Sequence, residues 1–422
     1  MKVLEYGRDD LKPVLERPGV DYSAVFDTVR PIIAAVRSEG DAALKAYTKK
    51  FDGVELDSLR VTEEEIEGAY SGLDVKLLKA LEHAYDNIRS FHAVQYQSVE
   101  EEWMYMVEDG VVVGERVAPL DSVGCYVPGG RASYPSTVLM TVTPAKIAGV
   151  KRVVVVSPPP ISGVVLAACR ITGVDEVYRV GGAQAIAALA HGTKSIKPVC
   201  KIVGPGNKYV TAAKMLVYGA VDIDLPAGPS EIMVLADGLA DPWFIAADFL
   251  AQAEHDPDAH CVLATDSAKL AGEVKGAVER EVKYSKKVEI ISKSLENLTI
   301  IKTTTLDEAI EFANQYAPEH LEIHTRNPED DARKIRNAGA IFIGPYSPVA
   351  AGDYASGGNH VLPTGGAARY SSQLSVRDYL KSTSIQNITK AGLQELAATI
   401  TALAEAEGLL EHKKSVEKRF KY

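Results

Sequence analysis

Strand-like runs of Val and Ile alternate with helical patterns over most of the chain after residue 120. Three runs are each followed by a loop and then by apolar residues at helical spacing; they read KRVVVVS, DEVYRVGG and CKIVGPGN. A strand, a loop and a helix repeated at this pitch predict a parallel sheet with helices on both faces.

A second series of the same kind follows between residues 231 and 344. Its strand-like runs are EIMVLAD, HCVLATD, VEIIS, LTIIK, HLEIHT and AIFIG, with helices expected from Asp241, from Leu306 and after Asn327. Two such series predict an α/β protein with two Rossmann-like lobes and parallel-rich sheets.

Shorter patterns describe the rest of the chain. In the mostly helical first part, Thr62 and Glu65 form a capping box that predicts a helix start. The segment VEDGVVVGERV predicts a β-hairpin about Asp109–Gly110. Residues 344–370 form a long glycine-rich stretch, of a kind that is often functional. An amphipathic helix is expected from Leu393.

These patterns suggest how the lobes divide the chain. We expect an N-terminal extension, a first α/β lobe made of two separate segments, a second α/β lobe and a C-terminal helical arm. The corresponding residues are 1–24, then 25–120 with 233–375, then 121–232, and finally 376–422.

Charge and cysteine content limit the possible functions. A net charge of −11 argues against binding to nucleic acid or to an anionic membrane, because both need a basic patch. No apolar run reaches the roughly 18 residues of a spanning helix, and the first twenty residues lack the apolar core of a secretory signal. The 4 cysteines stand far apart, as free thiols would in a reducing compartment. We therefore expect a cytoplasmic protein.

The stretch LAQAEHDPDAHC raises the question of a metal site. A helix from Asp241 should end just before Pro257, which places Gln252 and His255 three residues apart on one face. Taken alone, a histidine such as His255 is more often packed or solvated than a metal ligand. A glutamine is the weaker metal ligand, since zinc prefers His, Cys and Asp or Glu.

Two further stretches carry candidate catalytic or binding groups. Glu319 and His320 stand where a helical pattern meets a strand pattern, and together they could perform general acid–base chemistry. Asp353 lies in the glycine-rich stretch GDYASGGNHVLPTGG and could supply a metal carboxylate. The alternatives are a solvated turn and a flexible surface loop.

Glycine-rich loops at strand–helix junctions suggest anion binding. GPGNKYV at 204–210 places free backbone N–H groups at a helix start. It lacks the third glycine of a dinucleotide fingerprint, because Tyr209 occupies that position. VGGAQAI at 180–186 and YVPGGRASYPS at 126–136 have similar character. Together the three loops favour a nucleotide site of unusual form.

Six motifs in one order resemble the histidinol dehydrogenase family, from about Val117 to the C-terminus. They read GPGN, PAGPSE, AQAEHD, APEHLE, GDYASGGNHVLPTGGAARYSS and EGLLEHKKSV. The resemblance implies an intertwined homodimer with shared active sites that oxidises L-histidinol to L-histidine through L-histidinal. It also implies one zinc ion per subunit and NAD as the hydride acceptor, with NAD bound by the second lobe.

The resemblance also assigns site residues. It implies zinc ligands at Gln252, His255, Asp353 and His412, with His412 supplied by the partner subunit. Glu319 and His320 are implied as the catalytic pair. Substrate contacts are implied at Ser230, at Glu407 from the partner, and at the zinc ligands and catalytic pair, namely Gln252, His255, Asp353, His412, Glu319 and His320. NAD contacts are implied at Tyr126, Gln184 and Asn207. His360 stays unassigned.

Three alternatives remain open from the residues themselves. The nearest is a zinc- and NAD-dependent dehydrogenase of another small diol, against which Glu407 and His412 argue, because they suit an imidazole and an amine. A zinc hydrolase using Glu319 would need no nicotinamide, yet the paired strand–glycine–helix units favour a nucleotide. A non-catalytic dimeric scaffold would not retain every motif residue.

Overall fold

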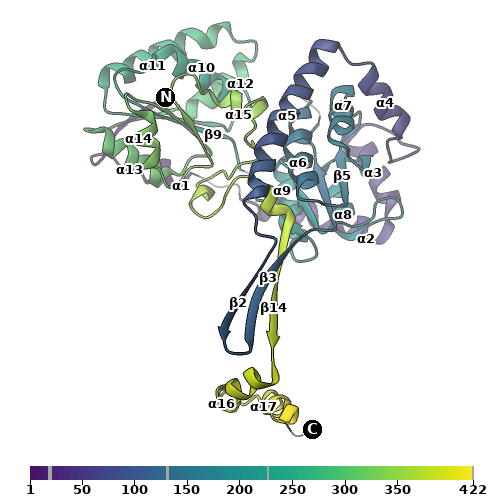
Figure 1. The fold of residues 1–422 in the computed structure, drawn as a ribbon. Coiled ribbons are helices and arrows are strands. Elements are labelled where there is room, and N and C mark those ends of the chain that lie inside the picture. The colour runs from purple at the N-terminus through teal and green to yellow at the C-terminus, as the bar shows by residue number, and fades with distance from the viewer. Residues whose placement is uncertain (18–20, 130–132, 226–227, 421–422) are drawn as a thin grey trace.

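The computed structural model describes residues 1–17, 21–129, 133–225 and 228–420. Two lobes lie side by side, and a narrow arm projects from them to a helical tip at the C-terminus (Figure 1). The first lobe contains a six-stranded sheet and the second a five-stranded sheet. All strand pairs within these two sheets are parallel, which confirms the predicted α/β fold with parallel sheets. None of the described helices is both long and apolar enough to cross a membrane.

The sheet of the first lobe has the order β1-β11-β10-β9-β12-β13. Both of its faces are covered, since Ile232 and Val234 pack on one side and Met233 and Leu235 on the other. Its strands are β1 (Lys2–Glu5), β9 (Glu231–Ala236), β10 (His260–Thr265), β11 (Thr299–Lys302), β12 (His320–His324) and β13 (Ala340–Ile343). Its helices are α1 (Lys12–Glu16), α10 (Pro242–Ala253), α11 (Ala268–Glu281), α12 (Val288–Ser294), α13 (Leu306–Tyr316), α14 (Pro328–Arg333) and α15 (Val349–Tyr354).

The sheet of the second lobe has the order β6-β5-β4-β7-β8. Counted from β4 this is 3-2-1-4-5, the order of a nucleotide-binding doubly wound sheet, and the strand order reverses between β4 and β7. Its strands are β4 (Ser122–Tyr126), β5 (Arg152–Ser157), β6 (Glu176–Arg179), β7 (Lys201–Val203) and β8 (Asp222–Ile223). The helices that follow them in sequence are α6 (Pro135–Ile147), α7 (Gly163–Thr172), α8 (Gly182–His191) and α9 (Lys208–Val217).

The N-terminal helices cover the second lobe, which differs from the expected grouping of residues 25–120 with 233–375. These helices are α2 (Ser23–Glu39), α3 (Asp41–Asp52), α4 (Glu63–Ser71) and α5 (Val75–Gln97). The reason is apolar packing, because Val29 and Ile88 are fully buried in the two cores that flank the five-stranded sheet. Strand β1, within the expected extension 1–24, instead pairs with β11 of the first lobe.

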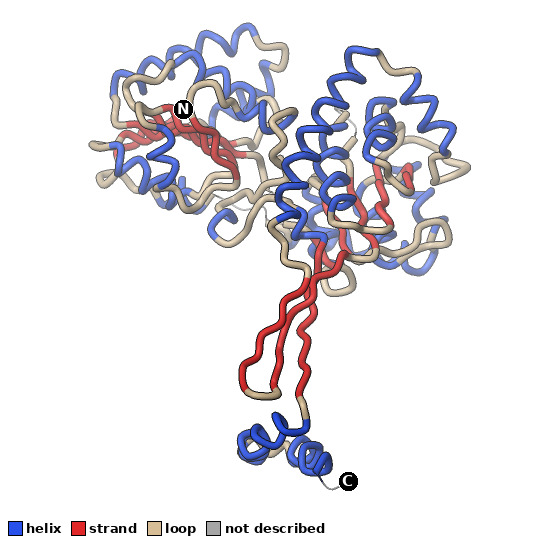
Figure 2. Tube along the Cα trace, in the orientation of Figure 1, coloured by secondary structure: helices blue, strands red, loops and turns tan. Residues whose placement is uncertain are grey.

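The arm is a three-stranded antiparallel sheet with two helices at its tip (Figure 2). Strands β2 (Glu102–Glu108) and β3 (Val111–Pro119) form the predicted hairpin, and β14 (Leu380–Ile388) pairs along β3. Helices α16 (Lys390–Ala406) and α17 (Leu410–Glu417) follow. The segment 376–422 is therefore part strand, where a wholly helical arm was expected.

Local predictions can be compared directly. The capping box between Thr62 and Glu65 is present in both directions, which confirms the helix start. The expected strand VEIIS is wrong, since Val288–Ser294 forms α12. Ile291 and Leu295 are both buried and lie four residues apart. That spacing places both side chains on one face of a helix.

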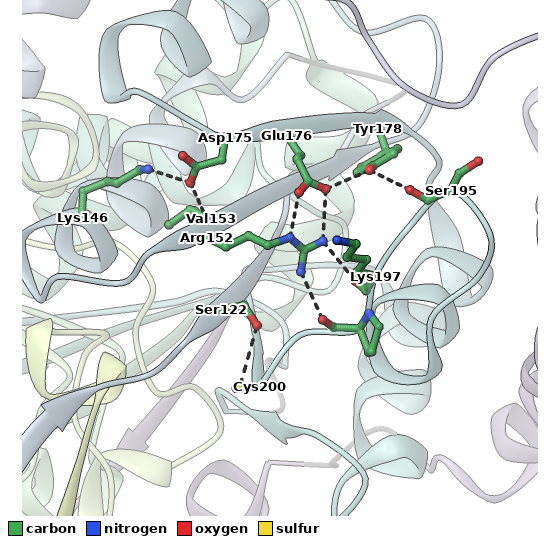
Figure 3. Close-up of polar contacts among 11 residues, drawn as sticks. Ser122, Lys146, Arg152, Val153, Asp175, Glu176, Tyr178, Ser195, Lys197 and Cys200 are labelled. Carbon is green, nitrogen blue, oxygen red and sulfur yellow. Dashed lines mark hydrogen bonds and ion pairs between the residues drawn. The ribbon is translucent and has the colours of Figure 1, made fainter.

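A polar network joins the amino ends of β5 and β6 in the second lobe (Figure 3). Arg152 forms two hydrogen bonds with the Glu176 carboxylate, at 2.8 and 3.1 Å. The Tyr178 hydroxyl donates to the same carboxylate at 2.8 Å. Arg152 also donates to the carbonyl oxygens of Lys197 and Pro198, both at 3.1 Å. The network therefore fixes the amino edge of this sheet. The cleft described below lies at the opposite, carboxyl edge.

Candidate active site

A cleft of about 1830 Å³ lies between the lobes. On the second lobe it is lined by loops that follow β4, β7 and β8, at the carboxyl edge of the sheet. On the first lobe its walls include Ser230, Glu319 and His320, at the amino ends of β9 and β12. The cleft thus joins opposite edges of two parallel sheets, so a ligand within it contacts both lobes.

Strand β9 holds both expected catalytic side chains through the backbone of one residue. The Glu231 N–H donates to Glu319 Oε2 at 2.7 Å. The Glu231 carbonyl oxygen lies 2.8 Å from His320 Nδ1. These bonds form because β12 runs parallel to β9, with His320 opposite Ile232. Glu319 and His320 are therefore fixed side by side, as the sequence predicts, with Oε2 and Nδ1 3.6 Å apart.

The bond to Glu231 determines which nitrogen of His320 can act as a base. A carbonyl oxygen only accepts, so Nδ1 carries the hydrogen and Nε2 keeps its lone pair. Nε2 is buried without a hydrogen-bond partner among the described residues. Burial lowers the pKa of His320 to about 4, so the ring is neutral near pH 7. His320 is consequently suited to accept a proton at Nε2.

The pKa of Glu319 is shifted in the opposite direction from that of His320. Its side chain is only 7% exposed, and burial raises its pKa well above the usual value. The carboxyl groups of Glu231 and Asp353 raise that pKa further. A carboxyl group with a raised pKa is a stronger base once ionised, which suits it to take a proton from water.

Helix α10 brings Gln252 and His255 to the cleft. Asp241 caps its first turn by accepting from the Trp243 N–H at 2.8 Å. The helix ends at Ala253, earlier than the expected end before Pro257. His255 therefore lies in the following turn, where its N–H donates to the Gln252 carbonyl at 3.2 Å. Both side chains line the cleft, Gln252 buried and His255 open to it.

Asp353 stands near the end of α15, a short helix inside the stretch expected to be a loop. Its Oδ1 lies 3.9 Å from His320 Nε2, and burial raises its pKa to about 6. His360, left unassigned from the sequence, also lines the cleft, with Nδ1 3.1 Å from the Asp353 carbonyl. Residues that the chain separates by about a hundred positions thus meet at one place.

This group of donors fits a divalent metal ion. An amide oxygen from Gln252, an imidazole from His255 and a carboxylate from Asp353 form a nitrogen–oxygen set that zinc and similar ions accept. Among the described residues, neither Asp353 nor Glu319 forms an ion pair with lysine or arginine. A cation would therefore offset negative charge that the chain leaves unpaired.

The expected NAD contacts lie on the second lobe in two positions. Asn207 lines the cleft and caps α9 by accepting from the Tyr209 and Val210 N–H groups at 3.0 and 3.2 Å. Tyr126 and Gln184 are buried behind the loops. The Tyr126 hydroxyl accepts from the Gly182 N–H at 3.1 Å. Gln184 Oε1 has no partner among the described residues.

Two expected site residues lie elsewhere. Glu407 follows α16 and His412 lies in α17, both exposed at the tip of the arm (Figure 1). Neither lines the cleft of its own chain. The structure therefore does not bring them together with Gln252, His255 and Asp353.

Glu231 is a supporting residue of the candidate site that the sequence reasoning missed. Its backbone holds the expected catalytic pair, and its carboxylate pairs with Arg17 at 3.0 Å. The Gly365 N–H donates to the same carboxylate at 3.1 Å. The available signal was its place beside Ser230, as the last residue of PAGPSE.

Comparison with known proteins gives one consistent result. The histidinol dehydrogenase family model matches residues 15–420. Histidinol dehydrogenase of Methanothermobacter thermautotrophicus is 52% identical over 426 residues, covering 100% of this chain and 99% of its own. That of Bacillus subtilis is 50% identical over 397 residues, covering 93% and 92%. The crystal structure of histidinol dehydrogenase from Elizabethkingia anophelis matches with a TM-score of 0.94 at 38% identity, covering 100% and 98%. The chain therefore belongs to the histidinol dehydrogenase family.

Proposed function

We propose that this protein oxidises L-histidinol to L-histidine through L-histidinal, using NAD as the hydride acceptor and zinc to orient the substrate. The observation that carries the proposal is the arrangement around His320. Its unprotonated Nε2 points toward Asp353, while Glu319 lies against the same ring. A base and a water-activating carboxylate are both needed, because the reaction removes two hydrides from one carbon and adds one water.

Gln252, His255 and Asp353 would hold the metal, and a fourth ligand would come from His412 of a second chain. A bound zinc ion would supply a positive charge and coordination sites for the imidazole and amine nitrogens of histidinol. This chain alone offers three of the four ligands at the cleft. The proposed metal site is therefore complete only in a dimer.

His320 performs the first proton transfer in this scheme. Nε2 takes the proton of the substrate hydroxyl as the hydride leaves its carbon for NAD, which gives histidinal. Holding Nδ1–H against the Glu231 carbonyl keeps the lone pair on Nε2 directed into the cleft. The same bond stabilises the imidazolium that forms.

Glu319 acts in the second half of the reaction. Its carboxylate takes a proton from a water molecule as the water oxygen adds to the aldehyde carbon of histidinal. The His320 imidazolium returns its proton to the aldehyde oxygen, which forms the hydrate and restores neutral His320. His320 then takes a hydroxyl proton of the hydrate as the second hydride leaves. This gives the carboxylic acid of histidine, which ionises to the carboxylate. Both side chains are only 5% exposed, so the surrounding protein limits the water that reaches them.

The second lobe supplies the proposed nucleotide site. The loop GPGN follows β7 and leads into α9, and all four of its residues line the cleft at the switch point of the sheet. Gly204 has φ +115, and a Cβ there would meet the Tyr126 carbonyl oxygen at 2.2 Å. This contact holds the loops after β4 and β7 close together, and NAD would be bound there through Asn207, which lines the cleft, whereas Tyr126 and Gln184 are buried and do not line it.

The arm supports a dimer with shared sites. Large apolar side chains are exposed along its strands and tip, as expected of a surface that another chain covers. These residues are Trp103, Met104, Tyr105, Met106, Val107, Leu403, Leu409 and Leu410. A second copy docked there would bring Glu407 and His412 to the cleft of the first.

NADH formation tests the proposal directly. We expect about two NADH per L-histidinol and one per L-histidinal, from the stoichiometry of the two oxidations. Chelation should abolish both, and added zinc should restore them. The absence of NADH with either substrate would overturn the proposal, and turnover that survives chelation would remove the metal from it.

A further inference from the structure

A buried ion pair in the second lobe holds the first residue of the loop GPGN. It joins Lys214 on α9 to Asp224, the residue after β8, and their side chains are only 3% and 5% exposed. Lys214 Nζ donates to the Gly204 carbonyl oxygen at 3.0 Å. The Gly204 N–H donates to Asp224 Oδ2 at 2.6 Å. The pair therefore binds both backbone polar groups of one glycine, and the chemistry proposed above assigns it no role.

Strand register and helix geometry bring the two side chains to this glycine. Strands β7 and β8 are parallel, with Ile202 opposite Ile223. Asp224 therefore leaves β8 beside the end of β7, where its N–H donates to the Ile202 carbonyl at 3.1 Å. Side chains on a helix lean toward its N-terminus, so Lys214 reaches back to the loop that precedes α9. The contact to Gly204 thus follows from the fold of the five-stranded sheet.

The loop GPGN also packs tightly against the end of β4, because a Cβ at Gly204 would overlap the Tyr126 carbonyl oxygen. The Gly204 N–H is occupied by Asp224. Among the described residues, the N–H groups of Gly206 and Asn207 donate to no acceptor, and both residues line the cleft. These two N–H groups are therefore the donors that the loop can offer to a bound nucleotide.

We propose that Lys214 and Asp224 are positioning residues that fix the Gly204 peptide and so orient the free N–H groups of GPGN toward NAD. The inference rests on the proposed NAD-dependent function, because its consequence is tighter nucleotide binding. A loop that is already ordered binds its ligand with less loss of conformational entropy. Hydrogen bonds to charged groups are stronger than neutral ones, which suits this pair to hold a glycine-rich loop.

Direct contact between Asp224 and the nucleotide is the competing explanation. In dinucleotide-binding folds, an acidic residue about twenty positions beyond the glycine-rich loop accepts from a ribose hydroxyl. Asp224 lies 20 residues after Gly204 and lines the cleft. Its Oδ2 accepts from Gly204, however, and its Oδ1 pairs with Lys214, so both oxygens are engaged within the protein. A ribose contact would discriminate NAD from NADP, whereas a positioning role would not.

Fluorescence titration of the intact protein with NADH tests the proposal without relying on turnover. Burial raises the pKa of Asp224 and the Lys214 ammonium opposes that shift, so Lys214→Met alone would leave a buried carboxyl group without its counter-ion. Lys214→Met combined with Asp224→Leu removes both bonds to Gly204 and leaves no unpaired charge. NADH affinity should fall at least about tenfold, the usual effect of losing a charged hydrogen bond.

Asp224→Asn should keep NADH affinity within about threefold of the original, although it removes a charge. The amide oxygen still accepts from the Gly204 N–H, and Lys214 still donates to the Gly204 carbonyl. Arg152→Met is the matched control, because Arg152 binds a carboxylate and two loop carbonyls at the opposite edge of the same sheet. It should lower thermal stability without weakening NADH binding. Zinc affinity should be unchanged in every variant, since the proposed metal ligands of this chain lie in the first lobe.

Each result supports or overturns the positioning role. NADH affinity of the double variant within about threefold of the original, or an equal loss in Arg152→Met, would overturn it. Asp224→Asn binding NADH as weakly as the double variant would also overturn it, and a gain in NADPH affinity relative to NADH would assign Asp224 to the ribose. If the original protein bound no NADH at all, the proposed function would fail first and this inference with it.

Discussion

The cleft and the tip of the arm hold their polar side chains in contrasting ways. In the cleft, Glu319 and His320 are about 95% buried and are fixed by the backbone of a neighbouring strand. At the tip, Glu407 and His412 are exposed, and the ion pairs around them join surface residues. The first region is organised by its own chain, whereas within the described chain no hydrogen bond or ion pair involves the side chains of Glu407 and His412.

This difference indicates where the proposed site is incomplete. Parallel strands gather groups from distant parts of one chain at a common edge, which is how Glu231 comes to hold the proposed catalytic pair. The three-stranded arm carries α16 and α17 away from that edge (Figure 2). Residues at the tip can therefore act in catalysis only by reaching the cleft of another copy.

Mixing two inactive variants gives the largest expected effect. His412→Ala should lose activity at least about a hundredfold and bind zinc weakly, because a direct ligand is removed. His320→Ala should be equally inactive. A heterodimer of the two would contain one site with both residues intact, so mixing after dissociation should restore about a quarter of the original activity.

The restored activity must appear only after subunits exchange. Mixing without dissociation is the control and should give no recovery while the dimers remain intact. If His412→Ala kept full turnover, or if exchanged mixtures stayed inactive although heterodimers had formed, the two regions would not share a site.

Glu319→Gln tests the cleft alone, without changing the tip of the arm. The amide oxygen can still accept from Glu231, so the local structure should persist, but the side chain can no longer take a proton from water. Oxidation of histidinal should slow by about 10²–10⁴-fold, the usual contribution of a general base. Release of the first NADH from histidinol should change much less. Stopped-flow absorbance separates the two, and an equal loss in both steps would remove the water-activating role.

The sequence predicted the elements well where periodicity was strong. The uninterrupted apolar run VVVV of β5 reflects burial on both faces, because Val153 and Val155 enter one core and Val154 and Val156 the other. It could not show that the N-terminal helices pack on the second lobe. An amphipathic helix reveals that it has an apolar face but not which sheet covers it.

The site was predictable only in part for a similar reason. Motif order identified Gln252, His255, Glu319, His320 and Asp353, all of which line the cleft. It did not identify Glu231 as a support, because its contribution comes from backbone atoms that every residue possesses. Strand pairing alone determines which backbone N–H and carbonyl meet those side chains.

The pH dependence of the free energy of unfolding gives a smaller expected effect. It compares a carboxylate of the second lobe with one on the arm. The hydrogen bonds from Arg152 lower the pKa of Glu176, whose side chain is 18% exposed (Figure 3). A lowered pKa in the folded state adds stability at neutral pH that is lost as the pH falls through that value. Glu176→Gln should therefore reduce the free energy of unfolding by about 1–3 kcal/mol at pH 7, with the difference shrinking below about pH 4. Glu405 is 62% exposed and pairs with Lys413, so Glu405→Gln should not measurably change the free energy of unfolding. Urea unfolding across this pH range checks both variants, and a pH-independent loss in Glu176→Gln would show that shape rather than charge is what the network needs.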